Sequence, residues 1–338
     1  MRQIWITRKG GPEVLQIREA PDPAPQEGQV RIRVRASGVN FADVMARLGF
    51  YRDAPPLPAV VGYEVAGTID AIGPGVSGRS VGERVVSFTR FGGYSDVVCV
   101  PHDQAVPIPE RLSFSQAAAI PVQWVTAWHM IVFLGNLQRG QRVLVQAAGG
   151  GVGTAAIQIA KRIGAEIIGT ASASKHERLR ALGLTHAIDY RNQDFEAEVK
   201  RLTSGKGVDL ALDAVGGASF KKSYRSLKPT GKLVMFGASS VAPDGSGSIL
   251  PALKTLVQMP RFWSMTMLNA NKGVFGVNLG HLWEEKELLG SELRAVLDGA
   301  QRGEFQPIVD LEVPFAEAPK AHARLQDRAN FGKVVLVP

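Results

Sequence analysis

Cysteine is nearly absent from the chain, which has only Cys99 among its 338 residues. A disulfide scaffold and a cysteine-rich zinc site both need several cysteines, so the count excludes both. A single cysteine fits a reducing compartment. The first ten residues also lack the apolar core of a secretory signal peptide, so we expect a cytoplasmic protein.

Long hydrophobic runs are also missing. The longest one spans residues 121–135 and contains Gln123, Thr126 and His129. A membrane-spanning helix needs about 20 mostly apolar residues. We therefore expect no integral membrane insertion.

Positive charge is in excess, but it is spread along the chain. There are 39 basic and 31 acidic residues, which gives a net charge of +8. Arg31, Arg33 and Arg35 alternate with apolar residues, which is the pattern of the solvated face of a strand. We expect no nucleic-acid partner, and a basic surface also suits a polyanionic cofactor.

Residues 1–122 have the pattern of strands and loops. Alternation with period two predicts a half-buried strand over 30–36, and a short helix fits within 37–48. Turn signals such as Gly73-Pro74-Gly75 separate further short strands. These are expected at 65–72, 83–88 and 95–100.

Residues 123–275 instead alternate short apolar runs with helix-like segments. The expected strands are 142–146, 166–170, 186–189, 208–214, 232–236 and 273–277. The expected helices are 152–163, 175–182, 194–202 and 218–227. Six strands joined by helices predict a doubly wound parallel sheet of the Rossmann type, so the fold class is α/β.

The pattern changes again in residues 276–338, with an amphipathic helix at 288–300 and a last strand at 333–337. Because the six-strand unit is already complete, we expect this tail to return to the domain formed by 1–122. The stretch 242–248 is rich in Gly and Ser and is expected to be a mobile surface loop.

The strongest chemical signal is the stretch VLVQAAGGGVG, in which a strand leads through glycines into a helix. This context is typical of dinucleotide binding, with Ala148, Gly150 and Gly153 in the three motif positions. Gly150 lets a pyrophosphate approach the main chain, and Gly153 lets the helix pack closely. The helix start at Gly151 and Val152 offers free N–H groups to phosphates. The alternative is a tight structural turn.

The segment after the next expected strand indicates which dinucleotide binds. NAD-binding proteins usually present Asp or Glu to the ribose about 20 residues after the glycines. This chain presents Ser172, Ser174 and Lys175 and no carboxylate. Hydroxyls and an ammonium can bind a 2′-phosphate, and Tyr190 and Arg191 add stacking and charge. We therefore expect NADPH; the alternative is that Ser174 caps a helix and Lys175 is solvated.

Several other stretches lie outside this motif: GVNFAD at 38–43, GYEVAG at 62–67, VGERV at 81–85 and GKVVL at 332–336. With them, the whole chain resembles the medium-chain dehydrogenase/reductase superfamily, and within it the zinc-free quinone oxidoreductase branch. NFADVMAR at 40–47, FLGNLQ at 133–138 and GTASASKH at 169–176 are similar to the vesicle amine transport protein homologues.

The resemblance implies a β-rich GroES-like catalytic domain formed by residues 1–122 and 276–338. It implies a Rossmann cofactor-binding domain formed by residues 123–275. The implied reaction is NADPH-dependent reduction of quinones or activated alkenes such as enones. The implied assembly is a homodimer through the Rossmann domain.

The resemblance also indicates whether the chain can bind a catalytic zinc ion. Zinc-containing members carry metal ligands at the positions of Asn40, Tyr63 and Val122. A catalytic zinc needs three N, S or O ligands from the protein, and none of these residues is Cys, His, Asp or Glu. We therefore expect no bound metal. The six histidines are scattered, and none of them pairs with another at the spacing of metal ligands.

The same resemblance implies roles for individual residues. Tyr51 is the candidate hydrogen-bond donor to the substrate, with an aromatic cleft wall as the alternative. Asn40 is expected beside the nicotinamide, where its amide could take part in catalysis, and Thr126 behind the ring. The remaining cofactor contacts are expected at strand ends and in the returning tail: Gly237, Phe275, Val277, Asn330 and Lys333.

Two other functions stay open. An enoyl-thioester reductase would use the same fold and cofactor. A membrane-associated, lipid-handling protein with a vestigial cofactor site would use residues 251–268 as an exposed apolar element, containing Leu256, Phe262, Trp263, Met265 and Met267. The alternative for that segment is packing between the fifth and sixth strands or at a dimer interface.

Overall fold

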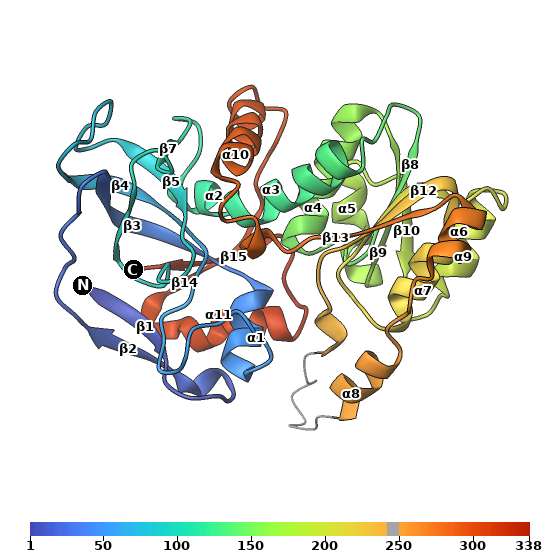
Figure 1. The fold of residues 1–338 in the computed structure, drawn as a ribbon, viewed down its shortest axis with the longest axis horizontal. Helices are drawn as coiled ribbons and strands as arrows, with labels where there is room; N and C mark the ends of the chain where they lie inside the picture. Colours follow the sequence, from blue (N-terminus) through green and yellow to red (C-terminus); the bar gives the residue numbers. More distant parts are fainter. Residues whose placement is uncertain (242–249) are drawn as a thin grey trace. The chain divides into compact units, whose positions relative to one another are not determined.

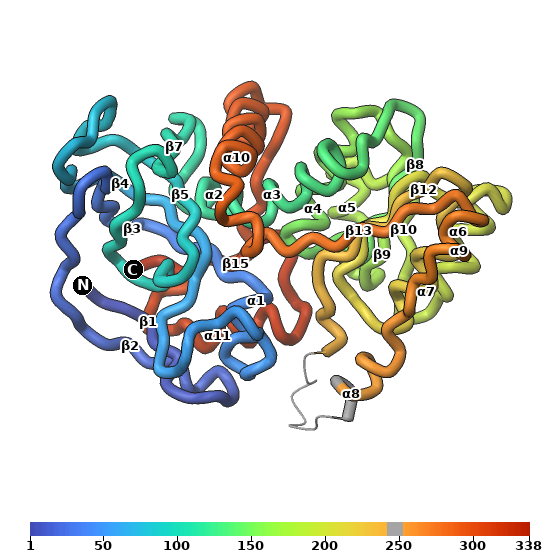
Figure 2. The backbone as a smooth tube through the Cα atoms, viewed as in Figure 1, coloured from blue at the N-terminus to red at the C-terminus, as the bar shows by residue number. Residues whose placement is uncertain are grey.

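The computed structural model describes residues 1–241 and 250–338, which form two compact units. The first unit comprises Met1–Val125 and Gly280–Pro338, and the second comprises Thr126–Leu279. The chain crosses into the second unit within helix α3 (Pro121–Trp128) and returns before helix α10 (Lys286–Gln301). The tube in Figure 2 follows this path from blue through green and orange to red.

A seven-stranded sheet of order β14-β15-β3-β4-β5-β7, with β6 paired to β3, forms the centre of the first unit. Only β14 and β15 run parallel, and the other pairs are antiparallel. Strands β1 and β2 form a separate antiparallel pair. The strands are β1 (Arg2–Ile6), β2 (Leu15–Glu19), β3 (Gln29–Val39), β4 (Glu64–Ile72), β5 (Arg84–Phe88), β6 (Val97–Pro101), β7 (Val106–Pro107), β14 (Val309–Pro314) and β15 (Lys333–Val337).

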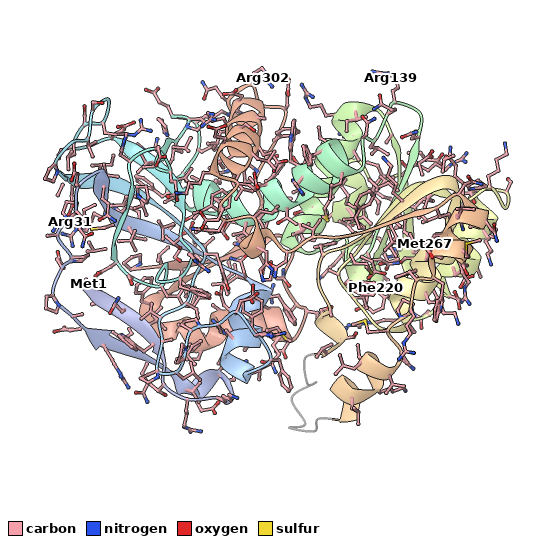
Figure 3. All side chains as sticks on the ribbon, in the orientation of Figure 1. Met1, Arg31, Arg139, Phe220, Met267 and Arg302 are labelled. Carbon is pink, nitrogen blue, oxygen red and sulfur yellow. The ribbon has the colours of Figure 1, made fainter. Side chains whose placement is uncertain are left out.

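Strand β3 shows the physical basis of the alternation of apolar and basic residues in its sequence. Its alternate residues Val30, Ile32 and Val34 are buried in the core between strands. On the opposite face Arg31 donates to Asp70 of the neighbouring strand β4 at 2.8 Å. Figure 3 marks Arg31 on this unit. Arg33 and Arg35 on this face are exposed, as expected, whereas Arg31 is only partly exposed and is ion-paired.

Four helices belong to the first unit besides the start of α3 (Figure 1). They are α1 (Phe41–Leu48), α2 (Phe114–Ala118), α10 and α11 (Ala318–Gln326), with 3-10 turns at Pro12–Val14, Leu279–His281 and Phe315–Glu317. Ala321 and Leu325 of α11 pack with Val44 of α1 and Val334 of β15 in one apolar core. The returning tail is therefore part of the first unit.

The second unit contains six parallel strands in the order β10-β9-β8-β11-β12-β13. The strands are β8 (Arg142–Val145), β9 (Glu166–Ala171), β10 (His186–Asp189), β11 (Val208–Asp213), β12 (Leu227–Met235) and β13 (Gly273–Gly276). The strand order reverses between β8 and β11, so the sheet is doubly wound as expected. At the reversal point the ends of β8 and β11 provide a place for a ligand.

Helices flank this sheet, α4 and α5 on one side and α6 and α7 on the other (Figure 1). The helices of the unit are α4 (Gly151–Ile163), α5 (His176–Leu182), α6 (Phe195–Leu202), α7 (Ala218–Arg225), α8 (Leu250–Val257) and α9 (Ser264–Ala270), with a π-helix at His129–Leu134 and 3-10 turns at Ala173–Lys175 and Ser239–Val241. Figure 3 marks Phe220 on α7 and Met267 on α9. The stretch 242–248, expected to be a mobile loop, lies outside the described residues.

Candidate functional site

The glycine-rich turn joins β8 to α4 at the carboxyl end of the parallel sheet. Ala147 has a φ of +52°, and Gly150 donates its N–H to the Ala147 carbonyl at 2.9 Å. A Cβ on Gly153 would lie 2.5 Å from the Ala148 carbonyl oxygen, so only glycine permits this packing of α4. A Cβ on Gly150 would meet one described atom, the Ala147 oxygen at 3.3 Å. The space in front of Gly150 is therefore open, as a pyrophosphate cradle requires.

Gly151 and Val152, the two remaining residues expected at this turn, open α4. Their main-chain groups belong to the first helical turn, where N–H groups have no partner within the helix. The first turn contains no acidic residue that would repel a phosphate. The arrangement fits a dinucleotide-binding turn.

The groups expected around a 2′-phosphate follow the two neighbouring strands. Ser172, Ser174 and Lys175 come directly after β9, and the two serine hydroxyl oxygens are 3.3 Å apart. The Lys175 side chain passes the glycine-rich turn, since a Cβ on Gly149 would lie 2.7 Å from its Cδ. Tyr190 follows β10 and is 41% exposed. The sheet thus brings hydroxyls, an ammonium and a phenol to the edge where the turn lies.

The other half of this edge holds the groups expected near the nicotinamide. Gly237 and Val277 lie just beyond β12 and β13. Val277 donates its N–H to the Met235 carbonyl at 2.8 Å, so this donor is already used inside the sheet. Phe275 lies within β13 and is 37% exposed, while Thr126 on α3 is buried. The expected contact between Val277 and a nicotinamide amide stays a prediction.

A buried polar chain beneath the turn was missed by the sequence reasoning. The Thr170 hydroxyl donates to Gln146 Oε1 at 2.6 Å, and Gln146 Nε2 donates to the Ser223 hydroxyl at 3.4 Å. Ser223 donates in turn to Asp213 Oδ2 at 2.7 Å. The Ala147 N–H is 3.3 Å from the Thr170 hydroxyl, which links the chain to the glycine-rich turn. Polar residues at the ends of apolar strands were the available signal.

Asp213 is the charged end of this polar chain. Besides the hydroxyl of Ser223 it accepts from Ser219 at 2.7 Å and from the Val215 N–H at 2.8 Å. Burial raises the pKa of Asp213, against the opposing effect of these donors. The carboxyl group holds α7 and the loop after β11 against the cofactor edge of the sheet.

In the first unit, a buried ion pair surrounds Asn40. Lys333 Nζ donates to Asn40 Oδ1 at 2.7 Å and to the Glu64 carboxylate, and Asn40 Nδ2 donates to Glu64 Oε1 at 2.9 Å. The Val122 N–H donates to the other Glu64 oxygen at 2.7 Å. A Cβ on Gly38 would overlap the Glu64 carboxylate and the Lys333 chain, so the cluster depends on this glycine.

This cluster bears on two expectations. Lys333 is fully buried and donates to Asn40, and its expected contact with a cofactor stays a prediction. The Asn40 amide has partners on both its oxygen and its nitrogen, so it is no free donor. Asn330, in the same tail, donates to the Gly332 carbonyl at 2.9 Å. Burial lowers the pKa of Lys333, and the Glu64 charge opposes this shift.

A second buried cluster lies around Asp43. Its carboxylate accepts from the Asn40 N–H at 2.8 Å, the Gly62 N–H at 3.2 Å and the Tyr94 hydroxyl at 3.1 Å. The Tyr94 hydroxyl is also 3.1 Å from His322 Nε2. Burial raises the pKa of Asp43 to about 7. Burial lowers the pKa of His322 to about 3, with a contribution from the Arg47 charge.

Tyr51, the expected substrate donor, lies within an aromatic group. Its ring meets that of Tyr63 edge to face, with centroids 6.3 Å apart. The Phe91 ring lies on Tyr63 at 5.3 Å. The structure therefore brings Tyr51 and Tyr63 together, although the sequence analysis considered Tyr63 only as a position where zinc-containing members carry a ligand.

Metal ligands do not gather in the described part of the chain. Across residues 1–241 and 250–338, no three His, Cys, Asp or Glu side chains could jointly hold a metal ion. His281 pairs with Asp53 at 2.8 Å and His186 with Glu166 at 3.1 Å, both near the surface. No helix among these residues is long and apolar enough to cross a membrane.

Helices α8 and α9 expose a large apolar surface, which we call the α8–α9 surface. It is formed by Leu253, Leu256, Val257, Trp263, Met265 and Leu268. Phe262 instead packs on Tyr224, with ring centroids 5.2 Å apart, in the core of the sheet. Phe262 is therefore partly covered by the core of the second unit, whereas Leu256, Trp263 and Met265 are exposed.

Comparisons with known families match both units. A model described as alcohol dehydrogenase GroES-like domain matches residues 26–110. A model described as zinc-binding dehydrogenase matches residues 151–285. The human synaptic vesicle membrane protein VAT-1 homolog is 40% identical over 341 residues, covering 100% of this chain and 86% of that protein.

Solved structures share the whole architecture. The quinone oxidoreductase of Escherichia coli, solved with NADPH, superposes with a TM-score of 0.87 at 31% identity and covers 100% of both chains. The CurK enoyl reductase superposes with a TM-score of 0.86 at 29% identity and covers 99% of this chain and 98% of its own. The GroES-like and doubly wound folds expected from the sequence are thereby confirmed.

Proposed function

This chain belongs to the medium-chain dehydrogenase/reductase superfamily, and from that premise we propose that it reduces quinones or activated alkenes such as enones with NADPH and without a bound metal. The observation that carries the proposal is the carboxyl edge of the six-stranded sheet. There an open glycine-rich turn lies beside two serine hydroxyls and the Lys175 ammonium. A similar structure, the quinone oxidoreductase of Escherichia coli, contains NADPH.

The donor set favours NADPH over NADH. Gly150 leaves room for the pyrophosphate, and the N-terminus of α4 directs its N–H groups to the same place. Ser172, Ser174 and Lys175 replace the carboxylate that would bind a free ribose hydroxyl. An ammonium and hydroxyls attract a phosphate, whereas a carboxylate would repel it.

A bound nicotinamide would supply the hydride, and the side chains of the protein would position the acceptor. Where zinc-containing members carry ligands, this chain has an amide at Asn40, a phenol at Tyr63 and an isopropyl group at Val122. The Asn40 amide is fixed by Glu64 and Lys333, and none of the three groups is a thiolate, an imidazole or a carboxylate, the ligands that zinc takes. We therefore assign the stabilisation of substrate charge to hydrogen-bond donors.

NADPH consumption by the purified protein tests this function. The acceptors are 9,10-phenanthrenequinone, a small enone and crotonyl coenzyme A, with NADH as the cofactor control. We expect turnover of the quinone, preference for NADPH and no effect of a chelator. Tight NADPH binding without turnover of any acceptor would contradict the reductase function.

An enoyl-thioester reductase is the second candidate, because the CurK enoyl reductase shares the fold. The same assay separates the two functions. Turnover of crotonyl coenzyme A well above that of the quinone would favour the thioester.

We also propose a homodimer through the second unit. β13 ends the sheet order and pairs only with β12 among the described strands, so one of its edges is open. The α8–α9 surface belongs to the same unit and exposes Trp263, Met265 and Leu268. Sedimentation velocity should give a dimer, whereas co-sedimentation of a monomer with lipid vesicles would instead favour the lipid-handling role.

A further inference from the structure

The Tyr63 hydroxyl is buried and makes no hydrogen bond of normal geometry, although the Tyr51 side chain lies near enough to interact with it. The residue is 8% exposed, and no described residue makes a hydrogen bond of normal length and angle with its hydroxyl group. Leaving a buried hydroxyl unpaired costs about 1–3 kcal/mol, and folded proteins rarely retain such a group. Such a hydroxyl can still donate its hydrogen bond to a group that comes within reach.

The main chain holds Tyr63 rigidly in place. Its carbonyl accepts from the Thr89 N–H at 2.8 Å. The preceding Gly62 donates to Asp43 at 3.2 Å and has a φ of +102°, where a Cβ would lie 2.6 Å from the Tyr94 ring. The point at which the phenol leaves the main chain is therefore fixed.

Aromatic rings surround this phenol. Tyr51 meets it edge to face at a centroid distance of 6.3 Å, and Phe91 lies tilted on it at 5.3 Å. Tyr51 and Phe91 are both only partly buried, so their rings offer surface to a ligand. Such a group favours a flat, π-rich ligand, because aromatic rings gain from edge-to-face and offset contacts.

The surroundings also keep the Tyr63 proton in place. Burial raises the pKa of Tyr63 far above its ordinary value, and the Asp43 charge and the Tyr51 side chain add to the shift. A phenol with such a pKa remains neutral and does not act as an acid. It donates a hydrogen bond without giving up its proton.

We propose that the Tyr63 hydroxyl donates a hydrogen bond to the carbonyl oxygen of a planar aromatic substrate that lies against Tyr51 and Phe91. This inference rests on the proposed reductase function for the reaction and names its donor and its substrate class. It moves the donor from Tyr51, the residue expected from the sequence, to its buried neighbour. A flexible acyl thioester has no ring to occupy such a group of aromatic side chains.

A hydrogen bond from Tyr63 is consistent with the balance of electrons and protons in quinone reduction. Hydride transfer moves two electrons and one hydrogen from NADPH to the quinone, and NADP⁺ is left. The resulting hydroquinone anion carries its charge on oxygen, where the Tyr63 hydrogen bond strengthens. The second proton comes from water, so Tyr63 is unchanged at the end.

The test is equilibrium binding of menadione to the protein saturated with NADP⁺, which cannot reduce it. Tyr63→Phe removes only the hydroxyl and keeps the ring, and Tyr51→Phe makes the same change at the other candidate donor. We expect Tyr63→Phe to weaken menadione binding about tenfold, the size of one hydrogen bond, and Tyr51→Phe to change it less than threefold. Because it removes a buried hydroxyl that makes no hydrogen bond of normal geometry, Tyr63→Phe should melt at or above the wild-type temperature.

Three outcomes would overturn the inference: no menadione binding by the wild type, equal binding by Tyr63→Phe, or a greater loss in Tyr51→Phe. A clear drop in the melting temperature of Tyr63→Phe would also overturn it, since the hydroxyl would then have a structural partner. Tyr63-dependent binding without NADPH oxidation would support the inference and contradict the reductase function. The two proposals therefore fail separately.

Discussion

Replacing Gly153 by alanine tests the close packing on which the dinucleotide-binding turn depends. The new Cβ would lie 2.5 Å from the Ala148 carbonyl oxygen, 2.6 Å from the Ala147 carbonyl oxygen and 2.6 Å from Ala148 Cα. All three are main-chain atoms, so the turn itself must move. Overpacking of this kind costs about 1–3 kcal/mol, and the higher helix propensity of alanine returns about 1 kcal/mol. Three overlaps with main-chain atoms place the cost near the top of that range, and we expect a net loss of about 2 kcal/mol.

Thermal unfolding gives the measurement. In a domain of this size a loss of 1 kcal/mol lowers the melting temperature by about 2–4 °C, so Gly153→Ala should melt about 4–8 °C lower. Gly273→Ala is the control in the same unit, because its Cβ would make only ordinary contacts of 3.6 Å. It should melt within about 1 °C of the wild type. A Gly153→Ala protein as stable as this control would refute the packing argument.

Gly150→Ala separates cofactor binding from folding. Its Cβ would meet only the Ala147 oxygen, at 3.3 Å, and the backbone angles of Gly150 suit alanine. Loss of a glycine cap costs about 1 kcal/mol or less, so the melting temperature should fall by no more than about 4 °C. The Cβ would instead block the pyrophosphate, and loss of one charge-assisted hydrogen bond weakens NADPH binding roughly 10- to 150-fold. Unchanged NADPH affinity by calorimetry would place the pyrophosphate elsewhere.

Three further predictions concern charged groups. Lys175→Ala should weaken NADPH binding roughly 10- to 150-fold and leave NADH binding unchanged in a fluorescence titration, because only the 2′-phosphate loses a partner. Lys333→Met should destabilise the fold by about 3–5 kcal/mol in urea unfolding, since Glu64 then keeps a buried, unpaired charge, and adding Glu64→Gln should recover much of the loss. The folded-state pKa of Asp43, about 7, lies above its ordinary 3.8, so its stabilising effect is complete below pH 4 and disappears as the pH rises through 7. The stability of the wild type relative to Asp43→Asn should therefore fall from pH 5 to pH 8, and a constant difference would contradict the buried, proton-binding carboxyl group.

Local pattern made much of the second unit predictable. The six strands were expected within a few residues of their observed bounds, except that β12 begins earlier, at Leu227. Apolar runs of strand length and helical periodicity are properties of neighbouring residues, so the sequence carries them directly. The order of glycines between β8 and α4 is equally local, and it indicated the dinucleotide-binding turn.

The polar clusters of the first unit were not predictable in the same way. Asp43, Tyr94 and His322 come together from positions 51 and 228 residues apart. Each alone looks like an ordinary polar residue in a helix, loop or tail. A buried Glu64 within an apolar strand was a signal, but nothing in the sequence identified Lys333 as its partner.

The sequence by itself determined the fold class, the change of pattern between the two parts of the chain and the turn suited to a dinucleotide. Each of these depends only on the spacing of residues that are close together in the sequence. Only the tertiary structure decided that the Asn40 amide is held by Glu64 and Lys333 and that the Tyr63 hydroxyl is buried and makes no hydrogen bond of normal geometry with a described residue. These facts depend on which distant segments meet and on how much water they exclude. The burial of a side chain and its contacts with distant residues exist only in the folded chain. Residues of the same type can therefore have different roles, although they look alike in the sequence.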